Sequence, residues 1–124
     1  MTAGARRYAN HLESAIVTKP RAIDFSAAAP VSHDAGVHDS EAEVAGTRWA
    51  LVEYSPGSGR ADWCETPHAG YVVSGALTYE FEDGREPLVL TAGHGFALPE
   101  APRHRGRNEG REPARLFLID ALPG

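Results

Sequence analysis

Polar and apolar residues alternate along several short stretches of the chain. In the segment 77–82, three apolar residues alternate with three polar ones, and Asp83-Gly84 follows at once. Because successive side chains of an extended strand point to opposite faces, this period of two predicts a strand with one buried face. The Asp-Gly pair tolerates the positive φ angles of a tight turn, so the segment predicts the first half of a β-hairpin.

Other short stretches have the same texture. The segment 47–54 places Ala50, Val52 and Tyr54 on one face and a second apolar pair on the other. We predict further strands in the ranges 23–25, 70–75, 88–90, 95–98 and 115–120. Glycine (13 residues) and proline (9 residues) punctuate the chain between these stretches, and no segment predicts a long helix.

Many short strands with almost no helix predict an all-β fold. The specific expectation is a small antiparallel β-barrel or jelly roll with very little helix. Such barrels remove exposed sheet edges and enclose a cavity at one mouth, which predicts a pocket for a small molecule. Its interior is expected to hold Leu77, Tyr79, Phe81, Leu98, Phe117 and Ile119. Trp49 and Trp63 lie outside that set, which favours a homodimer.

The first part of the chain has a different composition. We predict that residues 1–45 hold an N-terminal strand or strands and a mobile polar segment, and that residues 46–122 form the barrel, all within one structural domain. The stretch 26–45 is small, polar and acidic, which is typical of a mobile surface segment. His33 and His38 fall within it and are therefore expected to be solvated.

Size and charge narrow the function classes. A chain of 124 residues and 13.3 kDa is one domain, large enough to bury its own core. The formal net charge of −5 argues against nucleic acid or an anionic membrane as partner. Cys64 is the only cysteine and the first residues lack an apolar run, so a cytoplasmic location is expected.

The segment 92–108 carries four residues with a distinctive spacing. Gly93, Pro99, His104 and Asn108 stand in register with the second signature motif of the cupin superfamily, with alanine where that family usually has its second glycine. The segment therefore resembles the part of a cupin barrel that supplies one metal-binding histidine.

The segment 56–75 resembles the first cupin motif in frame but not in chemistry. Counting back from Gly75, the position of the family's glutamate holds His68, that of its second histidine holds Cys64, and that of its first histidine holds Asp62. The chain is thus identified as a small single-domain cupin with a divergent first motif. The resemblance implies one metal near the barrel mouth, commonly iron, manganese, nickel or zinc.

The candidate metal ligands are His104, His68, Cys64 and Asp62. Asp62 and Cys64 are two apart on an extended chain, so their side chains leave the same face. A thiolate with two imidazoles favours zinc over iron, manganese or nickel. If all four residues bind, the site is structural; if Asp62 stays outside, one position is open for substrate. The alternative is a cupin without metal, in which Cys64 is a small buried residue.

Neighbouring polar residues have simpler interpretations. His94 stands between two glycines and is expected in a turn. Arg103, Arg105 and Arg107 alternate with His104, so they are expected to point outward as a solvated stripe.

These residues favour a metal-binding cupin that acts on or binds a small organic molecule. Loss of the triple-histidine face leans toward Lewis-acid chemistry of the isomerase, cyclase or lyase kind rather than oxygenation. The alternative is a non-catalytic small-molecule-binding or sensor cupin, possibly metal-free; a purely structural dimer is a third interpretation. No separate general base is identifiable in the sequence, so whether the protein is an enzyme, and on which substrate, stays open.

Overall fold

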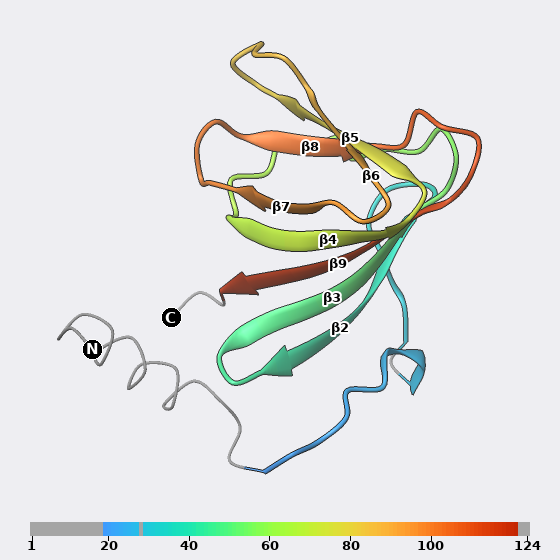
Figure 1. Cartoon of the computed structure of the whole chain (residues 1–124), viewed down its shortest axis with the longest axis vertical. Helices are drawn as coiled ribbons and strands as arrows, with labels where there is room; N and C mark the ends of the chain where they lie inside the picture. The colour runs from blue at the N-terminus through green and yellow to red at the C-terminus, as the bar shows by residue number, and fades with distance from the viewer. Residues whose placement is uncertain (1–18, 28, 122–124) are drawn as a thin grey trace, which may run out of the picture.

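The computed structural model describes residues 19–27 and 29–121, and these form an almost entirely β structure (Figure 1). The strands are β1 (Val31–Ser32), β2 (Val37–Val44), β3 (Thr47–Tyr54), β4 (His68–Ser74), β5 (Ala76–Phe81), β6 (Leu88–Thr91), β7 (Gly95–Leu98), β8 (His104–Arg107) and β9 (Ala114–Ala121). One 3₁₀ turn, η1 (Phe25–Ala27), is the only helical element in the described ranges. None of these residues belongs to a helix able to span a membrane. The predicted all-β fold is confirmed.

The strands form two antiparallel sheets. The six-stranded sheet has the order β1-β2-β3-β9-β4-β7, and the three-stranded sheet has the order β6-β5-β8. In Figure 1 the smaller sheet lies above the larger one, and the strands of the two sheets converge at one end of the molecule. The first four residues of β4 pair with all of β7, and β9 pairs over eight residues with β3, so β9 holds the two parts of the large sheet together.

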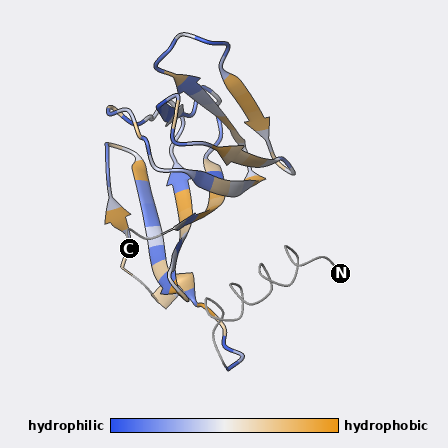
Figure 2. Ribbon diagram, turned by 90° about the vertical axis from the view of Figure 1, so that its left-hand side faces the viewer, coloured by the Kyte–Doolittle hydropathy of each residue, from blue (hydrophilic) through white to orange (hydrophobic). Residues whose placement is uncertain are grey.

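The core lies between the sheets, and the alternation in β3 and β5 predicts it correctly. Ala50, Val52 and Tyr54 of β3 are buried, as are Leu77 and Tyr79 of β5. Strands change colour along their length in Figure 2, as expected where each contributes both inward apolar and outward polar residues. Burial of this apolar set is the main source of stability.

The prediction for β9 is wrong in phase. Phe117 and Ile119 were expected inside, but Leu116 and Leu118 occupy the interior face. Phe117 lies on the opposite face, where its ring centroid is 5.7 Å from that of Trp49 and 6.1 Å from that of Phe25. Side chains of η1 and β3 thus cover the outer face of β9, and apolar residues occupy both of its faces. The sequence of the strand therefore lacks a clear period of two.

The first part of the chain also differs from expectation. Residues 37–44, placed in a mobile surface segment by their polar composition, form β2 and pair with β3 along its whole length. The strand expected at 23–25 is absent, and Phe25 instead begins η1. Backbone pairing and two buried inward residues, Val37 and Asp39, hold β2 in place despite its acidic sequence. Of the predicted segment 1–45, the first 18 residues and residue 28 lie outside the described part of the chain.

Gly75 turns the chain from the large sheet into the small one. It lies between β4 and β5 with φ at +74°, a conformation that side-chain-bearing residues rarely adopt. A Cβ atom there would lie 2.3 Å from the carbonyl oxygen of Pro113 and 2.9 Å from Cα of Ala114. The turn therefore depends on glycine for two reasons, its backbone angle and the closeness of the segment that leads into β9.

Candidate functional site

A cavity of about 230 Å³ lies between the two sheets. Its wall includes Cys64, His68 and His104 as one group and His33, Asp39 and Arg48 as another. Residues of β3, β4 and β9 contribute to it from the large sheet, and residues of β5 and β8 from the small sheet. This is the pocket that the predicted architecture implies.

Three of the four predicted ligands come together in this cavity. Ligand atoms of Cys64, His68 and His104 all lie within 4.8 Å of one another. The backbone sets the first pair: Cys64 N donates to His104 O at 2.7 Å, and His104 N donates to Cys64 O at 3.0 Å. Asp62 also lines the cavity, but it is exposed and does not join this group.

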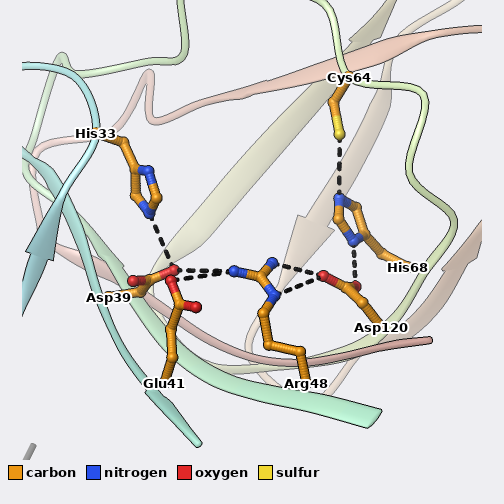
Figure 3. A network of polar contacts seen from close by, with 7 residues as sticks. All are labelled: His33, Asp39, Glu41, Arg48, Cys64, His68 and Asp120. Atoms are coloured by element: carbon orange, nitrogen blue, oxygen red, sulfur yellow. Dashed lines mark hydrogen bonds and ion pairs between the residues drawn. The ribbon is translucent and has the colours of Figure 1, made fainter. Parts of the chain in front are cut away.

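A residue that the sequence analysis missed orients His68. His68 Nδ1 donates a hydrogen bond to Oδ1 of Asp120, the buried carboxylate near the end of β9 (Figure 3). His68 Nε2 then lies 3.6 Å from Sγ of Cys64. The other oxygen of Asp120 accepts hydrogen bonds from Arg48 Nη2 at 2.5 Å and Nε at 3.1 Å. Asp120 thus selects which ring nitrogen of His68 faces the cavity.

Charges in this group shift one another's pKa. Contacts with His104 and then His68 lower the pKa of the Cys64 thiol to about 5. Burial opposes the charged form of His68, but Asp120 and Cys64 outweigh it and raise its pKa to about 9. Burial likewise opposes ionisation of Asp120, yet His68 and Arg48 hold its pKa below the ordinary value. The group therefore favours a thiolate beside an imidazolium at neutral pH.

His104 is the buried imidazole of the group. It is 2% exposed, and neither of its ring nitrogens has a hydrogen-bond partner among the described residues. Its neighbours are rings: His68 at 4.9 Å and Tyr79 at 5.6 Å between centroids. Buried polar atoms normally have partners because an unpaired one loses its interactions with water. A soft divalent metal ion shared with the thiolate and His68 would satisfy one of these nitrogens, so the residues present fit a metal.

The comparisons with known proteins agree with this architecture. The cupin domain family matches residues 50–120. The chain belongs to the cupin family. Comparison with curated protein sequences finds no match.

Similar solved structures include other cupin-like proteins of low sequence identity. A polyketide cyclase, RemF from Streptomyces resistomycificus, has a TM-score of 0.71 at 12% identity, covering 85% of this chain and 81% of its own. KdgF from Halomonas sp. has a TM-score of 0.67 at 18% identity, covering 85% and 96%. A sugar phosphate isomerase of the cupin superfamily from Silicibacter pomeroyi has a TM-score of 0.65 at 15% identity, covering 83% and 76%. At these identities they support the fold alone.

A second cluster of polar residues lies at the wall of the cupin cavity. Arg48 Nη1 lies 3.1 Å from Oε2 of Glu41 and 3.7 Å from Oδ2 of Asp39. Asp39 Oδ2 in turn lies 3.0 Å from His33 Nε2. His33, expected to be solvated, is an exposed residue, but its side chain also lines the cavity and contacts Asp39. His38, with 40% of its side chain exposed, pairs with Glu53 at 3.2 Å.

Two of the simpler interpretations hold in the cupin structure. His94 lies in a turn, where its Nδ1 accepts a hydrogen bond from Thr91 N at 2.9 Å. The arginines of β8 alternate with buried residues, and Arg105 places its guanidinium 4.0 Å from the Trp63 ring centroid. Trp63 therefore packs under an arginine on the outer surface rather than in the cavity.

Asn108 of the second cupin motif has a structural role. It is 1% exposed, and its amide nitrogen donates to Tyr54 O at 3.0 Å and to Glu112 O at 2.8 Å. Its side-chain oxygen accepts from Gly110 N at 2.9 Å. This residue ties β3 to the loop that precedes β9, and the role uses both the amide nitrogen and the amide oxygen of its side chain.

The lowered pKa of Cys64 has a measurable consequence. We expect the rate at which iodoacetamide alkylates the metal-free protein to rise through about pH 5 and to change less than about two-fold from pH 7 to 9. An ordinary thiol, with a pKa of 9.0, would react about 50-fold faster over the same interval because its thiolate fraction rises. His68→Gln should restore part of that dependence. A wild-type rate that climbs steeply above pH 7 would contradict the expectation.

Proposed function

We propose that this cupin binds one divalent transition metal ion through Cys64, His68 and His104, and that it acts on a small organic molecule held in the cavity. The gathering of the three side chains at one end of the cavity carries the proposal. The partnerless ring nitrogens of buried His104 add to it, because a metal would satisfy one of them.

The donor set favours zinc over iron, manganese or nickel. A thiolate and two imidazoles are the ligands that zinc takes most often, whereas harder cations prefer oxygen. Exposed Asp62 stands apart from the three side chains, which leaves three protein ligands. Three protein ligands with one remaining position is the arrangement of catalytic rather than structural zinc sites.

The chain's own residues prepare this end of the cavity. Asp120 holds His68 by Nδ1 so that Nε2 faces Cys64. Arg48 neutralises Asp120 and fixes its second oxygen. Such partners keep ligand side chains in place and tune their basicity. When bound, the ion would supply Lewis-acid polarisation of a substrate oxygen.

Lewis-acid chemistry of the isomerase, cyclase or lyase kind is favoured over oxygenation. The first-motif positions that hold two histidines and a glutamate in the family hold Asp62, Cys64 and His68, and non-haem iron oxygenases typically use histidine and carboxylate ligands rather than a thiolate. Two proteins of similar structure, a sugar phosphate isomerase and a polyketide cyclase, catalyse reactions of this kind. An oxalate oxidase also shares the fold, at 22% identity and with a TM-score of 0.64.

Metal analysis tests the proposal. Wild-type protein purified without chelator and supplied with zinc should carry about one zinc ion per chain. Competition with a zinc indicator would give the dissociation constant. His104→Ala should lose that binding because it removes the buried ligand. His94→Ala, which changes an exposed turn histidine, is the matched control and should keep it. Zinc-free wild-type protein, or undiminished binding by His104→Ala, would exclude the site.

A non-catalytic, metal-free cupin is the second candidate, and one observation favours it. Opposite charges already alternate along one row of contacting side chains, formed by Cys64, His68, Asp120 and Arg48. These four side chains therefore need no metal ion to balance their charge. In that case a small ligand would bind without turnover, and metal analysis would find none. The homodimer and the cytoplasmic location expected from the sequence stay predictions.

A further inference from the structure

A second histidine–carboxylate pair lies in the same cavity. His33 Nε2 lies 3.0 Å from Oδ2 of Asp39, and both residues line the cavity wall. Asp39 is 3% exposed, whereas the His33 side chain keeps 22% of its surface exposed. A buried carboxylate thus holds an imidazole that solvent and ligands can reach.

The pair fixes the proton of the ring. In the neutral imidazole, one nitrogen carries a proton and the other a lone pair. Because Nε2 donates to Asp39, the lone pair belongs to Nδ1 of His33, for which the described residues offer no partner. This arrangement, a carboxylate behind and a free basic nitrogen in front, is that of a histidine which accepts and returns protons.

Arg48 joins this pair to the candidate metal centre. Its guanidinium contacts Asp39 on one side and Asp120 on the other, and Asp120 holds His68. In Figure 3 the rings of His33 and His68 lie on the same side of this row of charges, at its two ends. The two imidazoles therefore approach the cavity from two places, with the arginine between their carboxylates.

We propose that His33, positioned by Asp39, is the acid–base residue of the cavity, which removes a proton from a carbon next to a substrate carbonyl and returns it. This inference rests on the proposed function and supplies the base that the sequence analysis did not identify. It also narrows the substrate to a small compound with a C–H bond beside a carbonyl group.

The proton-transfer step balances without a further reactant. The C–H bond breaks and its proton moves to Nδ1 of His33, while the electron pair forms the C=C bond of an enolate. The carbonyl π pair moves to the oxygen, which gains the negative charge. The imidazolium then returns the proton to the same carbon, the C=C pair takes it up, and the carbonyl and the neutral ring are restored.

The charges that face His33 suit this exchange. Asp39 and Glu41 face it from β2. Burial and the neighbouring Glu41 raise the pKa of Asp39. Burial also opposes ionisation of Glu41, but contacts with Asp39 and Arg48 outweigh it and lower the pKa of that carboxyl. Arg48 of β3 opposes them, but it is neutralised by Glu41 and Asp120. Asp34, next along the chain, is paired with Arg60 at 3.0 Å. The ring of His33 therefore lies beside two acidic side chains, and both nearby arginines are paired with carboxylates of their own.

Deuterium incorporation tests the inference with defined probes. Zinc-loaded wild-type protein in D₂O should exchange the carbon-bound hydrogens of hydroxyacetone or dihydroxyacetone, as followed by proton NMR. His33→Gln should lower the exchange rate about 100-fold, the scale of general acid–base catalysis, with unchanged zinc content and melting temperature. His38→Gln is the control. His38 lies in β2, near His33 along the chain, but its imidazole is paired with Glu53, so the exchange rate should match that of the wild type.

A ring measurement separates positioning from mere structure. Long-range ¹⁵N NMR correlations of His33 should show the proton on Nε2 and the lone pair on Nδ1 in the wild type. Asp39→Asn removes the carboxylate, so the proton should redistribute between the nitrogens and exchange should fall as in His33→Gln. Correlations that place the wild-type proton on Nδ1 would overturn the inference.

The outcomes distinguish this inference from the proposed function. Bound zinc with no exchange of either probe, or with equal exchange by His33→Gln, overturns the role of His33 and leaves the metal centre standing. Wild-type protein without zinc refutes the metal centre, and exchange that still depends on His33 would then support the base alone.

Discussion

Asp120→Ala should weaken zinc binding about 10- to 100-fold and lower the free energy of unfolding by about 3 kcal/mol. The substitution removes the acceptor that holds His68 Nδ1 and the main counter-ion of Arg48. The carboxylate is only 4% exposed, so water replaces little of what is lost. Competition titration with a zinc indicator and urea denaturation would measure the two effects.

The control for Asp120 is an exposed carboxylate with a similar pair. Asp83 contacts Arg85 at the surface, and Asp83→Ala should leave both measurements unchanged. The effect should also depend on pH. Burial opposes ionisation of Asp120, but contacts with His68 and Arg48 keep the pKa of this carboxyl below its ordinary value of 3.8. The carboxylate therefore contributes its full stabilisation near pH 7, and this contribution declines as the pH falls below about 3.8. Equal stabilities of the variant and the wild type at pH 7 would show that the network contributes nothing.

Gly75→Ala should lower the free energy of unfolding by about 3 kcal/mol or more. Alanine must adopt a φ near +74°, and its Cβ would overlap the Pro113 carbonyl oxygen at 2.3 Å. Since the contact is with backbone, no side chain can move aside to relieve it. Thermal and urea denaturation would give the change.

Gly84→Ala separates the two causes. Gly84 has φ at +80° but nothing within 4 Å of a Cβ atom, so alanine there bears only the backbone strain, about 1 kcal/mol. Similar losses for both variants would mean that the close approach of Pro113 to Gly75 is relieved by a small shift of the β4–β5 turn.

The sequence predicts those strands whose two faces differ in polarity. Ala50, Val52 and Tyr54 face the core as their alternation requires. In β9 the alternation fails, because Phe117 on the outer face is as apolar as Leu116 on the inner one, and Trp49 and Phe25 cover it. A strand that is covered on both sides carries no period from which its phase can be read.

Spacing along the chain predicts those site residues that belong to the two motifs. His104, Cys64 and His68 follow from the two cupin motifs, and the structure brings them together. Asp120 is separated from His68 by 52 positions, and a carboxylate near a strand end has the pattern of a solvated residue.

The polar composition of β2 explains why the second pair was missed. His33 and Asp39 stand in a polar, acidic stretch, and nothing local indicates that β2 enters the sheet. The partners of buried Asp39 are His33 Nε2, at 3.0 Å from its Oδ2, and Arg48 Nη1 on the neighbouring strand, at 3.7 Å. Only the three-dimensional pairing of these strands reveals such compensation.

The place of β9 in the large sheet affects the order in which a nascent chain can assemble. The strands β1, β2 and β3 on one side and β4 and β7 on the other meet only through β9. Until residues 114–121 have left the ribosome, two edges with unpaired backbone groups face solvent, and such edges invite association with other chains. Asp120 belongs to this same strand, so Arg48 and His68 lack their carboxylate partner until β9 joins the two parts of the sheet.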